Sequence, residues 1–330
     1  MTLQIQAEEE IWPLARSFRI ARGARNEARV ILVRLQDGDY LGQGEACPYS
    51  RYGESTASVL EQISSVAAEI EAGAGRDDLQ GLLPAGAARN AIDCALWDLE
   101  ARQSGRSVAA LAGVRDAGEI ITARTIVIDT PEAMRADAAK LSDAPLLKVK
   151  LDAEEVLERL GAVREAAPGA QIIVDANESW NADLLASLMQ PLAALEVALL
   201  EQPLPAGQDD ALGELEHLVP VCADESCHTT DDLERLSGLY DFINIKLDKT
   251  GGLTGALALA RAAGEQGMGV MLGCMVSTSL AMAPAALLAE FAEFVDLDGA
   301  WWLKEDRPNP VRYAHGKVIL PGEGLWGDAR

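Results

Sequence analysis

The chain has 330 residues, of which 49% are hydrophobic and 24% charged, and its 28 Lys and Arg against 52 Asp and Glu give a net charge of −24. This composition excludes a disordered or collagen-like chain, and the length suits one large α/β barrel or two ordinary domains. Because so acidic a surface repels other polyanions, we expect neither nucleic acid nor a membrane as a partner.

The first part of the chain predicts strands followed by helices. Apolar and polar residues alternate over residues 14–47, with turns near Gly23 and Gly38, which is typical of antiparallel strands. Two helices are expected next, over residues 58–71 and 87–102, because their apolar residues recur with helical spacing. This block is therefore α+β in character.

From about residue 120, short β-branched runs alternate with helical stretches. Eight such runs, with a helix expected between each pair, predict a parallel sheet closed into a barrel. An open doubly wound sheet alternates in the same way, but the chain has no glycine-rich nucleotide-binding turn, which favours the barrel. The eight strands are expected at residues 121–128, 146–151, 171–175, 197–201, 219–224, 242–246, 269–273 and 294–296, and a further short strand at 317–320.

Two features of the sequence bear on the cellular compartment. Residues 270–289 carry no charge, but Gly273 and Pro284 interrupt them, so we interpret this stretch as buried barrel rather than as a membrane span. The amino terminus lacks the basic and apolar segments of a signal peptide, and the five cysteines contain no CxxC pair. We therefore expect a cytoplasmic protein with free thiols.

Charged residues stand at the ends of six expected strands, where a barrel carries its catalytic groups. In chain order they are Lys150, Asp175, Glu201, Asp224, Lys246 and Asp296.

The three consecutive carboxylates among them, Asp175, Glu201 and Asp224, predict a metal site. Ends of neighbouring strands lie about 5 Å apart. Carboxylates that close repel one another unless a cation lies among them, and all-oxygen ligation suits Mg²⁺. A single Asp here would more simply cap a helix or form a salt bridge, but three in succession favour one Mg²⁺ per chain.

Three lysines are candidates for acid–base chemistry. Lys150 and Lys246 lie on the second and sixth strands, which face each other across an eight-stranded barrel, and Lys148 has the same inward parity as Lys150. The alternative is that they only pair with the carboxylates. Because an inward Lys-x-Lys is costly to bury for structure alone, we expect Lys150 and Lys246 to act on opposite sides of a substrate.

Two further pairs are candidates for substrate binding. Asp296 and Asp298 flank Leu297 after the last strand, where two carboxylates suit an ammonium group, although a turn or helix cap explains them equally well. Arg22 and Arg25 lie in a glycine-interrupted loop that suits a lid over the mouth, although from these residues alone an ordinary solvated surface is the better explanation.

Together these motifs resemble the muconate-lactonizing subgroup of the enolase superfamily, and within it most closely the L-Ala-D/L-Glu dipeptide epimerases. The resemblance covers nearly the whole chain. Its motifs are Lys148-Val149-Lys150, Asp175-Ala176-Asn177, Glu201-Gln202-Pro203, Asp224-Glu225-Ser226, Asn244-Ile245-Lys246-Leu247-Asp248-Lys249-Thr250-Gly251-Gly252, Leu272-Gly273-Cys274-Met275 and Asp296-Leu297-Asp298-Gly299.

This resemblance implies a fold with three parts. An α+β capping domain with lid loops would cover residues 1–118. A (β/α)7β TIM-like barrel with the catalytic mouth would cover residues 119–299, and a segment that returns to the capping domain would cover residues 300–330.

The resemblance also implies roles for the residues above. Asp175, Glu201 and Asp224 would bind Mg²⁺, Lys148 would contact the substrate carboxylate, Lys150 and Lys246 would move the α-proton, Asp296 and Asp298 would bind the ammonium group, and Arg22, assisted by Arg25, would meet the glutamate side chain.

The implied reaction is epimerisation of a small dipeptide, L-Ala-D/L-Glu, at the α-carbon of its C-terminal residue, as in murein peptide metabolism. Alternatives in the same subgroup are an N-acylamino-acid racemase, an o-succinylbenzoate synthase and a cycloisomerase. They need no ammonium partner, so Asp296 and Asp298 favour the dipeptide. A non-catalytic peptide-binding barrel is disfavoured because it has no use for two buried lysines. The sequence is also compatible with a homo-oligomer.

Overall fold

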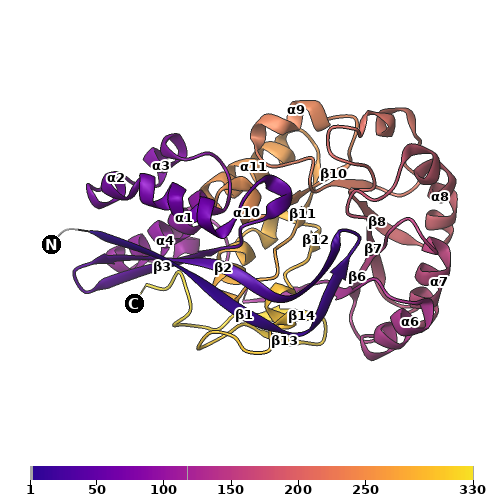
Figure 1. The fold of residues 1–330 in the computed structure, drawn as a ribbon, viewed down its shortest axis with the longest axis horizontal. Coiled ribbons are helices and arrows are strands. Elements are labelled where there is room, and N and C mark those ends of the chain that lie inside the picture. Colours follow the sequence, from indigo (N-terminus) through magenta and orange to yellow (C-terminus); the bar gives the residue numbers. More distant parts are fainter. Residues whose placement is uncertain (1–2, 117, 330) are drawn as a thin grey trace.

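A computed structural model describes residues 3–116 and 118–329, and it shows an antiparallel sheet with helices beside a large curled parallel sheet (Figure 1). The strands of the first sheet are β1 (Gln4–Ile20), β2 (Gly23–Asp37) and β3 (Tyr40–Ala46), in that order. The predicted antiparallel strands and both turns are therefore confirmed. β1 begins earlier than expected because its first half also pairs with β2, from Gln4 opposite Gln36.

The β1–β2 hairpin reaches from the first sheet across to the mouth of the barrel (Figure 1). Its register shifts between Pro13 and Phe18. Beyond this irregularity, the Phe18 ring packs edge-on against Trp302 of the C-terminal segment, with ring centroids 4.7 Å apart. This aromatic contact holds the far end of the hairpin, including Arg22, over the barrel.

Helices of the amino-terminal unit cover one face of its sheet. The predicted helix over 58–71 is two helices, because Val66 leaves the helical region with φ −113° and ψ 6°. α1 begins with a capping box between Ser55 and Ser58. The elements are η1 (Ser50–Tyr52), α1 (Thr56–Ser65), α2 (Ala67–Glu71), α3 (Arg76–Leu82), α4 (Ala87–Ser104) and α5 (Val108–Ala112), of which α3 and α5 were not predicted.

α4 lies unusually close to β3, and two glycines allow this. A Cβ at Gly42 would come within 2.3 Å of the carbonyl oxygen of Ala95, and one at Gly44 within 2.1 Å of that of Ala91. The α4 residues facing the sheet are correspondingly buried. The opposite side of α4 is buried as well, because it contacts the barrel, so α4 joins the two units.

The large sheet has eight parallel strands in sequential order, β5 to β12. Every predicted run contains one of them. The sheet curls so far that its two edges meet. This is shown by a hydrogen bond of 2.7 Å from Ala123 N–H, just before β5, to Val295 O of β12. The strands are β5 (Arg124–Ile126), β6 (Leu146–Lys150), β7 (Gln171–Asp175), β8 (Val197–Glu201), β9 (Val221–Ala223), β10 (Phe242–Ile245), β11 (Gly269–Leu272) and β12 (Phe294–Val295).

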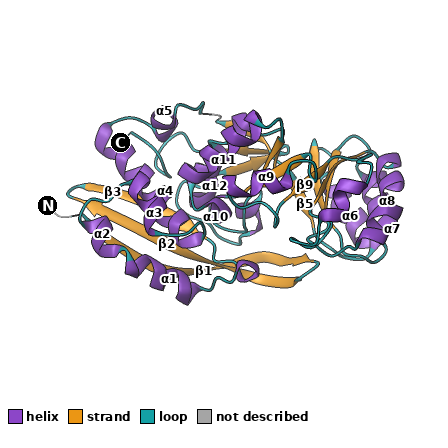
Figure 2. Ribbon diagram, turned by 90° about the horizontal axis from the view of Figure 1, so that it is seen from above, coloured by secondary structure: helices purple, strands orange, loops and turns teal. Residues whose placement is uncertain are grey.

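Helices pack around the outside of these strands (Figure 2). The expectation of an α-helix between each pair of strands is wrong between β8 and β9, where the described chain has only a 3-10 turn, η2. Pro203, Pro205 and Gly207 occupy this connection, and these residues disfavour helix. The outer elements are α6 (Pro131–Lys140), α7 (Val156–Ala166), α8 (Ala182–Ala194), η2 (Asp210–Glu214), η3 (Thr230–Asp232), α9 (Leu233–Leu236), α10 (Leu247–Thr250), α11 (Leu253–Glu265), α12 (Ser279–Ala286) and η4 (Ala289–Phe291).

The C-terminal segment runs back to the amino-terminal unit. It contains η5 (Gly299–Trp302), β13 (Arg312–Ala314) and β14 (Lys317–Ile319). β13 and β14 form a small sheet with β4 (Glu119–Ile121), so the predicted strand at 121–128 is split between two sheets. Near the end, Trp326 Nε1 donates to Cys94 O over 3.1 Å and Gly327 N to Asp98 Oδ1 over 2.8 Å, both on α4.

The uncharged stretch over residues 270–289 is buried barrel, as expected. It forms β11 and α12, and every residue of α12 is buried in the protein. In the described part of the chain, no helix combines the length and apolar character that a membrane crossing needs.

Candidate active site

Charged side chains that end the parallel strands meet at one end of the sheet. β6, β7 and β8 end at Lys150, Asp175 and Glu201, whose positions face one another in the register of the sheet. Asp224 follows β9 and Lys246 follows β10 directly. Each of the five side chains is at most 9% exposed. The structure thus brings together the lysines and carboxylates that the sequence predicted at the mouth.

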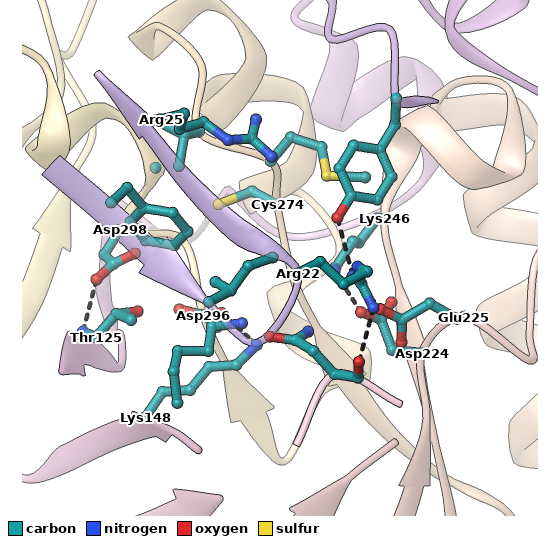
Figure 3. A pocket seen from close by; sticks show the side chains of 18 residues that line it. Arg22, Arg25, Thr125, Lys148, Asp224, Glu225, Lys246, Cys274, Asp296 and Asp298 are labelled. Carbon is teal, nitrogen blue, oxygen red and sulfur yellow. Dashed lines mark hydrogen bonds and ion pairs between the residues drawn. The ribbon is translucent and has the colours of Figure 1, made fainter. Parts of the chain in front are cut away.

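Lys148 lies at the centre of the carboxylates. Its Nζ is 2.7 Å from Glu201 Oε2, 2.9 Å from Asp296 Oδ2 and 3.1 Å from Asp175 Oδ2, and the side chain is only 1% exposed. Figure 3 shows Lys148 and Asp296 pointing toward each other at the base of the pocket. This ammonium group therefore links two of the predicted metal ligands to one of the predicted ammonium-binding residues.

The other lysines hold different carboxylates. Lys150 Nζ donates to Asp175 Oδ2 over 2.5 Å, and Lys246 Nζ to Asp224 Oδ2 over 2.6 Å. The second oxygen of Asp224 accepts a hydrogen bond from Lys249 Nζ over 2.8 Å. Lys150 and Lys246 thus approach the site from opposite sides of the cluster of carboxylates, and both line the same pocket.

Burial and neighbouring charges shift the pKa values of these groups strongly. Burial raises the pKa of Glu201 to about 7, and Asp175 and Asp224 add to the effect. Burial alone would also raise the pKa of Asp224, but Lys246 and Lys249 hold it well below its usual range. Burial would lower the pKa of Lys246, but Asp224 raises it. Without a further cation, the buried pairs of lysine and carboxylate therefore keep each other charged, as in Lys246 and Asp224.

The donor set fits a metal ion, although the ligands are turned toward lysines here. Among the described residues, no three His, Cys, Asp or Glu side chains stand in an arrangement that would hold a metal. However, the donors are buried oxygens, which Mg²⁺ prefers, and Asn177 Oδ1 and Glu225 Oε2 are buried beside them without hydrogen-bond partners. Burial is the main cause of the raised pKa of Glu201, and the repulsion by Asp175 and Asp224 that adds to it is what a bound cation would relieve.

Asp296 and Asp298 line the other side of the pocket. Asp298 Oδ2 accepts the backbone N–H of Thr125 over 2.7 Å, as Figure 3 shows. Burial raises the pKa of Asp298 to about 6, and Asp296 contributes to this shift. Asp296 Oδ1 is buried without a hydrogen-bond partner. Two adjacent carboxylates, one with an unsatisfied oxygen, are well suited to receive a cationic group.

Arg22 is engaged by protein acceptors at the tip of the hairpin. Its guanidinium donates to Glu225 Oε1 over 2.6 Å, to Asn177 O over 2.9 Å, to Tyr49 OH over 2.9 Å and to Glu178 Oε2 over 3.1 Å. These partners lie on the loops that follow β7 and β9 and on the loop after β3. Arg22 therefore ties the hairpin to the rim of the barrel.

Arg25 is placed differently from Arg22. It lines the same pocket, and its guanidinium lies 5.7 Å from the centre of the Tyr49 ring. Among the described residues it has neither a hydrogen bond nor an ion pair through its guanidinium. Of the two predicted lid arginines, Arg25 thus retains its donors for a ligand, whereas those of Arg22 are occupied.

Several residues of the site were given no role by sequence reasoning. Glu225 and Tyr49 hold Arg22, and Lys249 holds Asp224. Gln202 Oε1 accepts the backbone N–H of Asp224 over 2.8 Å, which ties the ends of β8 and β9 together. Glu225 and Gln202 stand directly after predicted metal ligands and belong to two of the motifs that carry the resemblance, which are the signals in the sequence that point to them.

Comparisons with known proteins find relatives over nearly the whole chain. A family model described as the mandelate racemase/muconate lactonizing enzyme N-terminal domain matches residues 2–113, and one described as enolase C-terminal domain-like matches residues 126–325. The chain is 52% identical over 318 residues to an L-Ala-D/L-Glu epimerase of Escherichia coli K12, covering 96% of this chain and 99% of that one. It is 46% identical to an N-acetyl-D-glutamate racemase of a Pseudoalteromonas species, covering 91% and 96%.

Solved structures are similar as well. An enolase family member from Agrobacterium tumefaciens with homology to dipeptide epimerases, solved with sodium and L-Ala-L-Glu, superposes with a TM-score of 0.96 at 47% identity, covering 98% of this chain and 100% of that one. A dipeptide epimerase from Enterococcus faecalis V583, solved with Mg and L-Leu-L-Tyr, superposes with a TM-score of 0.91 at 27% identity, covering 100% and 99%.

Proposed function

The chain belongs to the enolase superfamily, within its mandelate racemase/muconate lactonizing enzyme group, and on that basis we propose that it epimerises L-Ala-D/L-Glu dipeptides. The family and the barrel fold expected from the sequence are thereby confirmed. The proposed reaction inverts the α-carbon of the C-terminal residue and belongs to murein peptide metabolism in the cytoplasm.

The observation that carries this proposal is the placement of two lysines around one pocket. β6 and β10 are four strands apart in the eight-stranded sheet, so Lys150 and Lys246 approach the pocket from opposite sides. One lysine Nζ takes the proton from the α-carbon, and the other delivers a proton to the opposite face. This arrangement permits inversion, because a base held on one face of the substrate returns the proton to that face, and a second group on the opposite face can deliver it there.

Asp175, Glu201 and Asp224 are the residues proposed to hold one Mg²⁺ per chain. When bound, the cation supplies positive charge beside the substrate carboxylate, which makes the α-proton more acidic. Lys148 binds the same carboxylate group. To release their carboxylates, Lys150 and Lys246 turn toward the substrate, which leaves their amines positioned at the α-carbon.

The two ends of the dipeptide are recognised by opposite charges. Asp296 and Asp298 bind the free ammonium group, and the unsatisfied Oδ1 of Asp296 supports this assignment. We assign the acidic side chain of the substrate to Arg25 rather than to Arg22, because the donors of Arg22 are taken by Glu225 and its neighbours. Arg22 instead fastens the hairpin over the pocket.

A second candidate function is racemisation of an N-acylated glutamate. The 46% identical racemase named above favours it. An N-acyl amino acid has no ammonium group, so the buried Asp296 and Asp298 would face a neutral amide in that reaction. Asp296 would keep Lys148 as a partner, but Asp298 would gain no cation from such a substrate. Burying a charge without an opposite charge is costly, and this disfavours the second candidate.

Proton exchange in D₂O tests both candidates. The protein with Mg²⁺ is incubated with L-Ala-L-Glu, L-Ala-D-Glu, other Ala-containing dipeptides and N-acetylglutamate, and the α-proton signals are followed by NMR. We expect loss of the Glu α-proton signal together with formation of the other diastereomer for both Ala-Glu isomers. Faster exchange of N-acetylglutamate than of either dipeptide would replace the first candidate by the second.

A further inference from the structure

Lys249 is a buried lysine that the proposed reaction does not use. It lies on α10, three residues after Lys246, and its side chain is 0% exposed. Its Nζ donates to Asp224 O over 2.5 Å, to Asp224 Oδ1 over 2.8 Å and to Asn244 O over 2.8 Å. The three protons of this ammonium group therefore have three protein acceptors, and none is left for a ligand.

Asp224 is held by two lysines of different character. Lys246 donates to Oδ2 and lines the pocket, whereas Lys249 donates to Oδ1 from behind and is not among the residues that line it. Figure 3 shows Asp224 beside Lys246 at the edge of the pocket. Only the Lys246 contact can be exchanged for a contact with a ligand. When Lys246 turns away, Lys249 is the cation that remains on the carboxylate.

The same contacts extend to a second carboxylate. Asn244, whose carbonyl oxygen accepts from Lys249, donates through its side-chain Nδ2 to Glu201 Oε1 over 2.8 Å. Asn244 and Lys249 thus each fix one oxygen of a carboxylate, on Glu201 and on Asp224. The other oxygen of each carboxylate faces Lys148 or Lys246 in the pocket.

Burying an ammonium group costs desolvation free energy, which is offset only where its partners are well placed. Ordering a loop alone would not need such a group. The same loop is already ordered by another cation. Arg89 on α4 donates to Thr250 O over 2.8 Å and to Gly251 O over 3.3 Å, and it touches no carboxylate of the site. What distinguishes Lys249 from Arg89 is its contact with Asp224.

We propose that Lys249 is a positioning residue that keeps the Asp224 carboxylate oriented for a divalent cation after Lys246 has left it. This inference rests on the proposed function, because it takes Asp224 to be a metal ligand. Second partners of metal ligands commonly change metal affinity by 10–100-fold when removed. A lysine that acted by charge alone would have the opposite effect, since its removal would relieve repulsion of the incoming cation.

The test measures Mn²⁺ binding to the full chain without substrate, by calorimetry or by the EPR signal of free Mn²⁺. For Lys249→Met we expect the dissociation constant to rise about 10–100-fold. For the matched control Arg89→Met, which also removes a buried cation from this loop, we expect a change of less than about 3-fold. Unchanged or tighter binding by Lys249→Met, or equal weakening by both variants, overturns the positioning role.

Two further measurements separate the ways in which the test can fail. If the wild-type chain binds no Mn²⁺, the metal assignment of the proposed function is wrong, independently of Lys249. If Lys249→Met does not fold, the double variant Lys249→Met/Asp224→Asn is compared with Asp224→Asn. Recovery of folding in the double variant supports action through Asp224, whereas failure of the double variant alone overturns it.

Discussion

Gly273 lies so close to Lys246 that a Cβ at position 273 would stand 3.0 Å from Lys246 Cε and 2.6 Å from Asn244 Oδ1. Gly273 begins the loop after β11, next to the end of β10 in the sheet. The absence of a side chain there leaves room for both inward-facing side chains. The position of the Lys246 amine, which we propose as a catalytic group, therefore depends on the absence of a Cβ at position 273.

We expect Gly273→Ala to lower kcat by about 100-fold, since a displacement of about 1 Å at a reacting group has effects of that size. The change should reduce thermal stability only slightly if Lys246 and Asn244 shift to make room. Circular-dichroism melting and initial rates measure the two effects. Gly264→Ala on α11, where a Cβ would meet no atom within 4 Å, serves as the control. Equal activity of both variants would contradict the argument.

Removal of divalent cations should abolish activity, and Mg²⁺ should restore it. The physical reason is the loss of positive charge beside the substrate carboxylate, a contribution of several kcal/mol. Asp224→Asn should likewise inactivate the enzyme, because it removes a proposed ligand and breaks the pairs with Lys246 and Lys249. The measurement is epimerisation after dialysis against EDTA, with and without added Mg²⁺. Full turnover in excess EDTA would refute the metal assignment.

Substitution of one lysine should separate exchange from epimerisation. Lys150→Ala should stop epimerisation of both isomers, because both lysines act in each direction. Lys246 should still exchange the α-proton of one isomer with solvent, and Lys246→Ala should show the same behaviour for the other isomer. NMR in D₂O detects this directly. Exchange of both isomers by either single variant would exclude the arrangement of two bases on opposite faces.

Substrate choice should depend on the ammonium-binding carboxylates. Asp298→Asn should raise KM for Ala-Glu, and N-acetyl-Ala-Glu should be a very poor substrate of the wild-type enzyme. A buried charge that loses its partner typically costs about 3–5 kcal/mol, and Asp298 is 4% exposed. Steady-state rates with the free and acetylated dipeptides provide the measurement. Similar rates with both would favour the N-acylamino-acid racemase.

Two histidines should titrate far apart, which provides a test of the structure away from the active site. A hydrogen bond to Asp241 raises the pKa of His217, whose Nδ1 lies 2.7 Å from Asp241 Oδ2. Burial lowers the pKa of His228 to about 4, and Lys249 contributes. NMR of the imidazole signals should show one titration above about 6.5 and one near 4. Coincident titrations would contradict both environments.

The His217–Asp241 pair also has a stability consequence with a definite sign. Because the folded pKa of His217 is raised, its stabilisation is complete below the unfolded value of about 6.5 and is lost as the pH rises through the folded pKa. The free energy of unfolding should therefore be higher for the wild type than for His217→Gln, and this difference should be larger at pH 5.5 than at pH 8.5. We expect a difference below about 1 kcal/mol, because Asp241 is partly exposed. Urea denaturation at both pH values measures it. The contribution of His228 to the pH dependence is the same in both proteins and cancels in the comparison.

Much of the fold could be read from local patterns. β7 and β8 have the predicted bounds, because a run of apolar residues that ends at a charged one, Asp175 or Glu201, marks a buried strand and its exit into solvent or into a site. The break of the first helix at Val66 and the absence of an α-helix before β9 were not predicted. Pro203, Pro205 and Gly207 in the sequence do account for the missing α-helix before β9, but hydrophobic periodicity, which was used to place the helices, does not register such residues.

The sequence by itself determined the barrel, its order of strands and the inward-facing charges at their ends, since strand alternation and spacing are properties of neighbouring residues. Only the tertiary structure decided which charges pair. Arg22 meets Glu225, which lies 203 residues further along the chain, so the donors predicted for a substrate are occupied by the protein. Lys249 ends behind Asp224 rather than in the pocket, because α10 turns directly after Lys246. Such pairings depend on how distant elements dock, and the geometry of docking arises only when the chain is folded.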